Sequence, residues 1–194
     1  MGEYPAPKVD SLSTQIGGKY TPANTLIFPI KKNLQEAGVH VSHPLEDRFV
    51  YADDHVTLAF NPAKRSFADV ERDYYNSIAV SDFHTVCNSL NGNLGYVGDS
   101  AALEVAYAIR HSRPVIFQYP PEWKIGLNPV LMQILAARRA LFHVVDLMTE
   151  AESLLAKLLE VSSSRHSYEM RADETRYIDA SVERLLATLP STGV

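Results

Sequence analysis

The chain has 194 residues, of which 46% are hydrophobic and 21% charged, and its formal net charge at pH 7 is −5. This composition is typical of a globular domain and excludes a largely disordered chain. The acidic balance disfavours a binder of polymeric nucleic acid, because such proteins are usually basic. A single cysteine excludes an intrachain disulfide and a multi-cysteine zinc site. No uncharged apolar stretch approaches the ~18 residues of a membrane span and no signal peptide is indicated, so we expect a cytoplasmic protein without membrane contacts.

The first elements in chain order are a short strand and a helix. Residues 12–16 predict a strand, and Gly17-Gly18-Lys19-Tyr20 predicts a turn after it. Thr21-Pro22 is typical of a helix start, and Gly38 is typical of a helix end. Pro29 conflicts with an unbroken helix between them, so we expect a kink or a later start.

The next segment contains a strand, an ambiguous stretch and a second helix. Residues 39–41 predict a strand, whereas residues 45–65 are ambiguous apart from a short strand candidate at 56–60. Ser66, with Asp69 three residues later, has the spacing of a helix-capping box. The apolar stripe of this helix has helical spacing and consists of Phe67, Val70, Tyr74 and Ile78.

A buried strand, a loop and an apolar helix occupy the middle of the chain. Residues 83–87 form a compact apolar run and predict the strand. Residues 88–98 are rich in glycine and asparagine and predict a loop. Asp99 or Ser100 is expected to cap the next helix, over residues 101–111.

The remaining chain predicts two further strands and three helices. These elements are a strand at 115–117, a helix at 130–139, a strand at 141–145, and helices at 150–161 and 173–189. Because strands alternate with helices as far as residue 149, we expect an α/β domain over 1–149 whose parallel sheet is flanked by helices. Residues 150–194 carry no strand signal and predict a helical C-terminal extension.

Two loops are candidates for a ligand site, because parallel sheets bind ligands at the carboxyl ends of their strands. They are residues 17–21 and 88–100. Glu104 is the one charge among residues 101–109, about one turn from the start of a helix that should be mostly buried. A carboxylate at the edge of a core is a candidate nucleophile or base. The alternative is an exposed glutamate that interacts with the helix dipole.

Several other polar residues are weaker candidates on their own. Asp73 lies beside the apolar stripe of its helix and is otherwise a solvated acid, and Asp82 precedes a strand and is otherwise a turn residue. Ser100 could hold a phosphate at a helix N-terminus. The backbone of Gly17-Gly18-Lys19-Tyr20 could cradle an anion or form an ordinary turn. The histidines show no metal-ligand spacing, so we expect no metal site.

A set of motifs resembles the nucleoside 2-deoxyribosyltransferase superfamily, which includes nucleoside 5′-monophosphate N-glycosidases. The motifs are Gly95-Tyr96-Val97-Gly98-Asp99-Ser100, Glu104, Tyr107-Ala108 and Arg113-Pro114-Val115-Ile116. Asp73 matches the acid of the preceding helix in that superfamily. Ser112-Arg113-Pro114 replaces the usual Gly-Lys-Pro, and the usual Gly-Ser-x-Arg loop is not reproduced near Lys19.

The resemblance implies a Rossmann-like (flavodoxin-like) fold and a retaining reaction at an N-glycosidic bond. Glu104 would attack C1′ of the sugar, Asp73 would protonate the departing base and Asp82 would support it. Water or a second nucleobase would then accept the sugar, without a metal or redox cofactor. The implied substrate-binding residues are Gly17, Gly18, Lys19, Tyr20, Asn88, Gly95, Gly98 and Ser100.

The implied partner is a nucleoside or nucleotide, and the superfamily's shared sites imply a homodimer or a higher homo-oligomer. Two other interpretations stay open. One is a non-catalytic Rossmann-like module that senses a nucleotide, and the other is a structural homo-oligomer that has lost activity.

Overall fold

The computed structural model describes residues 12–18, 26–44, 49–51, 57–59, 66–124, 129–163 and 170–189. At its centre is a parallel sheet in which β2, β6, β10 and β12 lie side by side, and β1, one residue before β2, pairs with β3. The sheet order is therefore β3, β1–β2, β6, β10, β12, which is flavodoxin-like. The strands are β1 (Ser13–Thr14), β2 (Ile16–Gly17), β3 (His40–Val41), β6 (His84–Val86), β10 (Val115–Phe117) and β12 (Phe142–Val144).

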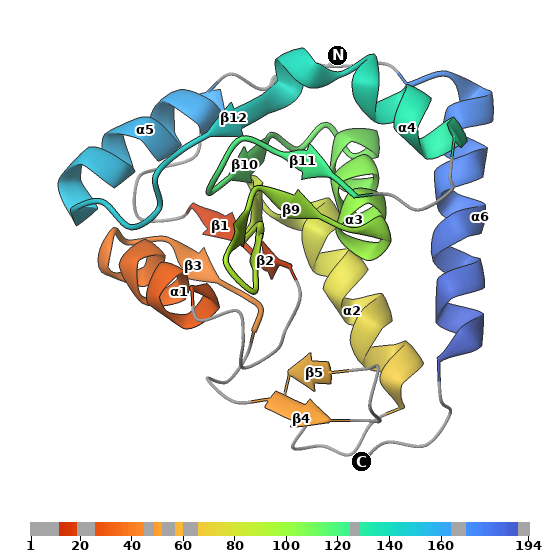
Figure 1. The fold of residues 1–194 in the computed structure, drawn as a ribbon, viewed down its shortest axis with the longest axis horizontal. Helices are drawn as coiled ribbons and strands as arrows, with labels where there is room; N and C mark the ends of the chain where they lie inside the picture. Colours follow the sequence, from red (N-terminus) through yellow and green to blue (C-terminus); the bar gives the residue numbers. More distant parts are fainter. Residues whose placement is uncertain are drawn as a thin grey trace.

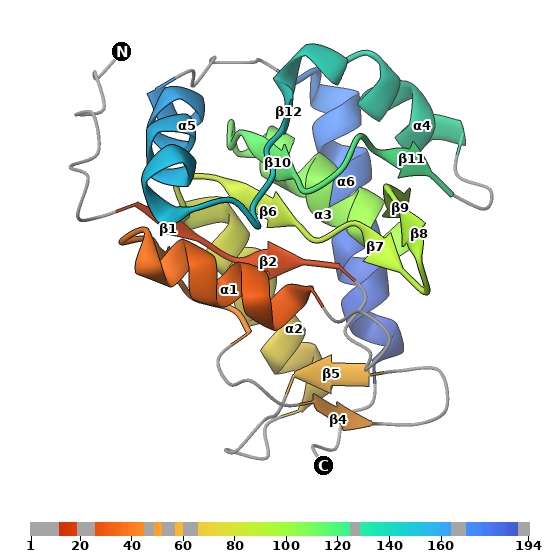
Figure 2. The ribbon, with the colours of Figure 1, turned by 60° about the vertical axis from the view of Figure 1, so that its left-hand side comes forward.

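Helices cover both faces of this sheet (Figures 1 and 2). α1 and α5 share one core cluster, whereas α2, α3, α4 and α6 share the other. The predicted Rossmann-like α/β fold with a helical C-terminal extension is thus confirmed. The helices are α1 (Ile27–Glu36), α2 (Phe67–Val80), α3 (Asp99–Arg110), α4 (Pro129–Ala136), α5 (Ala151–Ser163) and α6 (Ala172–Thr188).

Strand alternation divides the core between the two faces. Val115 and Phe117 of β10 pack in the cluster with α2 and α3, whereas Ile116 between them packs in the cluster with α1 and α5. Successive side chains of a strand point to opposite faces, so a fully buried strand is apolar throughout. This is why the short run Val115-Ile116-Phe117 could be predicted as a strand.

The two helices with the clearest start signals behave differently. The Ser66 cap of α2 is confirmed, since Asp69 N donates to Ser66 Oγ over 3.1 Å and Ser66 Oγ donates to Asp69 Oδ2 over 2.6 Å. α1 begins at Ile27, which places Pro29 in its first turn, where a missing N–H has no intrahelical partner to lose. The start expected at Thr21-Pro22 lies outside the described residues.

The expected caps of α3 are wrong. α3 begins at Asp99, its N-cap is Gly98 in an extended conformation, and no side chain caps it. Asp99 and Ser100 therefore lie inside the first turn. Acidic residues favour that turn as well as the cap, so the sequence did not distinguish the two positions.

The segment 88–98, expected to be a loop, contains short strands. β7 (Ser89–Leu90) and β8 (Asn93–Leu94) form an antiparallel hairpin across Asn91-Gly92, whose φ angles are 51° and 79°. Two positive φ values are what a two-residue hairpin turn requires, and Asn-Gly is its preferred sequence. β9 (Tyr96–Val97) then pairs in parallel with β11 (Glu122–Trp123). Two-residue strands are too short to show alternation, so the pattern concealed them.

Two smaller features complete the description. β4 (Phe49–Tyr51) and β5 (Thr57–Ala59) form an antiparallel hairpin, so the strand candidate at 56–60 is confirmed and β4 is additional. α4 ends at Ala136 and not at Arg139, because the chain tightens into a 3-10 turn, η2 (Arg139–Leu141), before β12.

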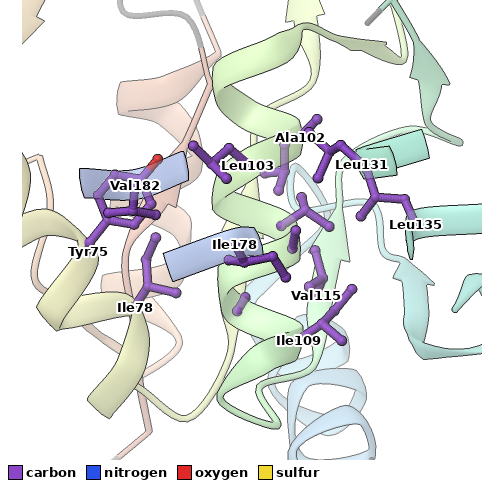
Figure 3. Close-up of a cluster of buried hydrophobic side chains, with 14 of the residues drawn as sticks. Tyr75, Ile78, Ala102, Leu103, Ile109, Val115, Leu131, Leu135, Ile178 and Val182 are labelled. Atoms are coloured by element: carbon purple, nitrogen blue, oxygen red, sulfur yellow. The ribbon is translucent and has the colours of Figure 1, made fainter. Parts of the chain in front are cut away.

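The C-terminal helices pack in different layers. α5 lies on the sheet, where Leu154, Leu158 and Val161 join the cluster of α1, whereas α6 lies outside α2 and α3 (Figure 1). Figure 3 shows Ile178 and Val182 of α6 directed toward these two helices. The division expected after residue 149 thus falls between β12 and α5, although α5 packs on the sheet to which β12 belongs.

Two ion pairs connect α6 to the domain. Arg138, which is 2% exposed, contacts Glu174 over 2.5 Å, and Arg110 of α3 contacts Asp179 over 2.8 Å. Within the described ranges, no helix is both long enough and apolar enough to cross a membrane.

Candidate active site

Glu104 is a buried carboxyl on α3, with 7% of its surface exposed. Every residue between Ala102 and Ile109 except Tyr107 is buried, because this helix packs against the sheet, α2, α4 and α6. Glu104 is the charged residue among them, so its carboxyl is withdrawn from water. Burial of an ionised carboxylate is costly unless the group is paired or loses its charge.

Two side chains, those of Tyr74 and His84, lie beside this carboxyl, and Gln15 contacts His84; we call these four residues the Glu104 cluster. Tyr74 Oη of α2 donates a hydrogen bond to Glu104 Oε2 over 2.9 Å. His84 Nε2 of β6 lies 3.8 Å from the same oxygen, and His84 Nδ1 contacts Gln15 Nε2 over 2.9 Å. Gln15 and His84 are both fully buried.

Strand register explains why these polar residues meet. Thr85 pairs with Ile16, and Val86 pairs with Gly17, in the parallel ladder between β2 and β6. Ile16 packs on the face of α1 and α5, so Gln15 and Gly17 lie on the opposite face, beneath α2 and α3. His84 lies on that face as well, because Val86, two residues later, packs there.

Gly17 provides the close approach between strand and carboxyl. A Cβ atom at this position would lie 2.2 Å from Glu104 Oε2 and 2.9 Å from both His84 Cε1 and Tyr74 Oη. No side chain fits there without displacing the carboxyl. The structure therefore brings together two of the predicted site residues, Gly17 and Glu104.

The position of Gly17 is also the topological switch point of the sheet. From β2 the chain crosses one face through α1 to β3, and from β6 it crosses the other face through α3 to β10. Connections that leave adjacent strands in opposite directions separate at the carboxyl ends, where open α/β sheets bind ligands. Gly17, at this point, packs against Glu104, Tyr74 and His84 of the Glu104 cluster.

Burial perturbs both titratable groups of the cluster. It raises the pKa of Glu104 to about 8, the negative charge of Glu71 adds to the rise, and the hydrogen bond from Tyr74 opposes it. Burial also lowers the pKa of His84 to about 3. At neutral pH both groups are therefore uncharged when no ligand is bound. Such a carboxyl can act as an acid, or as a weakly solvated nucleophile once it ionises.

Glu71 is a neighbour of this cluster that the sequence did not single out. It lies on α2 one turn before Tyr74, and burial raises its pKa to about 7. Its charge raises the pKa of both Glu104 and Tyr75. The i, i+3 spacing of Glu71 and Tyr74 was the available signal, since it places both on one side of the helix.

The two predicted aspartates are placed differently from each other. Asp73 is exposed on α2, and its charge acts on His43. Asp82 Oδ2 accepts hydrogen bonds from Ser13 N over 2.8 Å and Ser13 Oγ over 3.0 Å. This contact lies at the amino end of β1, whereas Gly17 lies at the carboxyl end of β2. In this structure Asp82 therefore joins two strands.

Two of the predicted binding residues hold the segment 88–98 in place. Asn88 is buried, its Nδ2 donates to Tyr119 O over 2.8 Å, and its Oδ1 accepts from Tyr119 N over 3.0 Å. Gly95 has a φ of +89°, and a Cβ there would lie 2.5 Å from Pro120 O. These contacts fasten the segment after β6 to the segment after β10.

The other predicted binding residues are placed as follows. Gly18 has a φ of +135° and packs on the carbonyl of Cys87, so it belongs to the turn after β2. Gly98 precedes α3, and Ser100 is exposed in its first turn. Lys19 and Tyr20 lie outside the described residues.

Among the residues that the structure describes, no three histidine, cysteine or acidic side chains gather in a way that could hold a metal ion.

Comparisons of the chain with protein-family models, with curated proteins and with solved structures found no match.

Proposed function

We propose that the protein cleaves the N-glycosidic bond of a nucleoside or a nucleoside 5′-monophosphate, with Glu104 as the nucleophile. The observation that supports this most is the placement of Glu104, which is a buried carboxyl against the Gly17 backbone at the switch point of the sheet. The motif resemblance around residues 95–117 supplies the reaction class.

In the proposed reaction, the two carboxyl oxygens of Glu104 have different roles. Oε2 accepts the hydrogen bond from Tyr74, so Oε1 is the oxygen that attacks C1′. The bond from C1′ to the base breaks, its electron pair leaves with the base, and an acid supplies the proton. Water or a second base then attacks C1′ and releases the carboxylate, as in retaining glycosidases.

Burial serves this reaction by making the ionised carboxylate poorly solvated. Positive charge develops at C1′ in the transition state, and a weakly solvated carboxylate stabilises it strongly. Because Glu104 must be ionised while the acid keeps its proton, we expect a bell-shaped pH profile, in which kcat/KM rises as Glu104 ionises and falls again where the acid loses its proton.

Two carboxyls of α2 are candidates for the acid. The resemblance assigns this role to Asp73, whereas the electrostatic contact with Glu104 favours Glu71. A pKa of about 7 suits an acid that works near neutral pH. We propose Glu71 as the acid, and Asp73 as the alternative.

The test is chromatographic detection of free nucleobase from a panel of nucleosides and nucleoside 5′-monophosphates, both ribo and deoxy. Each substrate is incubated with and without a second base. We expect release by the wild type and a loss of about 10⁴-fold or more in Glu104→Gln. Glu36→Gln, which alters an exposed carboxyl on α1, is the matched control. Release that persists in Glu104→Gln would refute the assignment.

A non-catalytic nucleotide-binding module is the second candidate. The observation that favours it is the raised pKa of Glu104, since a protonated carboxyl can donate a hydrogen bond to a bound base or sugar. In that case the wild type would release no base from any substrate, while a nucleotide would still raise its melting temperature.

The proposal includes a homodimer, since the resemblance implies sites that subunits share. Light scattering of the full chain measures the mass directly. A monomeric mass together with base release would leave the reaction in place and remove the shared site.

A further inference from the structure

His84 is a member of the Glu104 cluster to which the reaction above assigns no role. It is fully buried, and its Nε2 atom has no hydrogen-bond partner among the described residues. A buried polar atom without a partner costs free energy, so the position requires an explanation. Glu104 Oε2 lies 3.8 Å from this atom.

The contact with Gln15 determines where the proton of His84 lies. The Gln15 amide nitrogen can only donate, so His84 Nδ1 accepts its hydrogen bond. Because burial keeps the ring neutral, with a pKa of about 3, its one proton is on Nε2. The N–H group therefore points to the side of the ring on which Glu104 lies.

The distance between the two groups suits a contact that forms when the carboxyl ionises. At 3.8 Å, His84 Nε2 and Glu104 Oε2 are too far apart for a hydrogen bond. An ionised carboxylate attracts a donor more strongly and binds it at about 2.7–2.9 Å. An approach of about 1 Å by a glutamate side chain closes this gap.

We propose, building on the function proposed above, that His84, held by Gln15, is a positioning residue that donates its Nε2–H to Oε2 of ionised Glu104. Tyr74 and His84 would then both hold Oε2, and Oε1 would be directed at C1′. No proton moves in this step. The bond that forms is a hydrogen bond, and the proton remains on His84 Nε2.

The described groups that act on the charge of Glu104 are few. From α2 they are Tyr74, Tyr75 and Glu71, and from β6 there is His84. Glu71 disfavours ionisation of Glu104, whereas the hydrogen bond from Tyr74 favours it. A second donor from His84 would favour it further, so its removal should raise the pKa of Glu104.

Two amide substitutions of His84 separate the effect of losing the Nε2–H donor from the effect of losing the ring. In His84→Gln the amide nitrogen can take the place of Nε2, whereas in His84→Asn the shorter amide reaches only the place of Nδ1. The titration of Glu104 is followed by ¹³C NMR of the glutamate side-chain carboxyls, with Glu104→Gln to assign the signal. We expect the midpoint to rise by about one unit in His84→Asn and to return toward the wild-type value in His84→Gln.

Activity provides a second readout. At pH 7 we expect kcat to fall about tenfold in His84→Asn with little change in KM, and the rising limb of the pH profile to shift with the NMR midpoint. If His84→Asn fails to fold, Gln15→Met tests the same contact, because it releases Nδ1 and should also raise the midpoint. Melting curves of each variant establish that it is folded.

The two proposals fail in different ways. Base release by the wild type, with equal Glu104 midpoints in every folded variant, would overturn the role of His84 and leave the reaction. A wild type that releases no base would overturn both the reaction and the positioning role in it. A midpoint shift in such a protein would show only that His84 contacts Glu104.

Discussion

Glu104 and Glu174 are two buried carboxyls whose surroundings differ in one respect. Both are at most 9% exposed. Glu174, at the start of α6, faces the guanidinium of Arg138 and also accepts a hydrogen bond from Arg171 N over 3.1 Å. Among the described residues, Glu104 faces a neutral hydroxyl and a neutral imidazole, and a second carboxyl opposes its charge.

The difference separates a carboxyl that holds two elements together from the carboxyl that we propose as the nucleophile. A buried carboxylate with a cation partner keeps its charge, and removal of either partner destabilises the fold. A buried carboxylate without a cation partner resists ionisation and gains most from a ligand that becomes positively charged. The fold thus uses the Arg138–Glu174 pair to hold α6, whereas the Glu104 cluster has properties suited to catalysis.

After the loss expected in Glu104→Gln, the largest effect on activity concerns the acid that serves the Glu104 cluster. If Glu71 protonates the leaving base, Glu71→Gln should lower kcat/KM by about 10² to 10⁴-fold. Asp73→Asn, two residues away on an exposed face, should lower it less than tenfold. Steady-state kinetics of base release measures both. The reverse order of the two losses would return the role to Asp73.

Removal of the charge of Glu174 should have the largest effect on stability. Glu174→Gln removes the carboxylate that contacts the buried guanidinium of Arg138, and the loss of one partner of a buried ion pair costs about 3–5 kcal/mol. The measurement is urea denaturation at pH 7, and the control is Asp179→Asn, which affects a pair whose aspartate is 45% exposed. An equal loss in both variants would contradict the role assigned to burial.

The pH dependence of stability is the next test of the Glu104 carboxyl. Folded Glu104 holds its proton to about pH 8, whereas the unfolded chain releases it near 4.5. Unfolding therefore releases a proton between these values, and stability falls as pH rises, by about 1.4 kcal/mol per unit. Glu104→Gln removes this slope, so its advantage over the wild type should grow by about 2 kcal/mol from pH 6.5 to 8.

The range from pH 6.5 to 8 is chosen because, at lower pH, the titration of His84 changes stability in the opposite direction. The pKa of His84 is about 3 in the folded protein and ordinarily 6.5, so its contribution to stability is fully present above pH 6.5 and is lost as pH falls toward 3. Above pH 6.5 that contribution is constant. Thermal or urea melts of the two proteins at several pH values give the difference, and a constant difference would contradict the raised pKa of Glu104.

The smallest expected effect is steric. Gly17→Ala introduces a Cβ atom where Glu104 Oε2, His84 and Tyr74 already lie, which should cost about 1–3 kcal/mol and displace the carboxyl. In Glu104→Ala the oxygen is absent, so the same Gly17→Ala change should cost less there. A double-mutant cycle by urea denaturation measures this coupling. Additive losses would show that Gly17 does not contact the carboxyl in solution.

The sequence predicted the fold better than the site. Regular signals, such as the Ser66 capping box and the apolar run 115–117, act within a few residues and were read correctly. The hairpin across Asn91-Gly92 was missed because its strands are too short for alternation, although the turn signal was present. The start of α3 was misplaced because acidic residues favour the cap and the first turn alike.

Within the site, Glu104 could be identified because one charge in an apolar helix is a local anomaly. Gln15 and His84 could not, since only the pairing register of β2 with β6 places them on the same face. Glu71 and Asp73 are neighbours in sequence on one helix, and the direction of each side chain decides which of them acts on Glu104. Such relations depend on tertiary packing, which no spacing rule encodes.

The double hydrogen bond between Asn88 and the Tyr119 backbone has a mechanical consequence. It joins the segment that follows β6 to the segment that follows β10, and Gly95 packs against Pro120 beside it. We therefore expect the two segments to move together at the carboxyl edge of the sheet. We expect a displacement of one segment to be passed to the other through these contacts, and the first turn of α3 follows one of them.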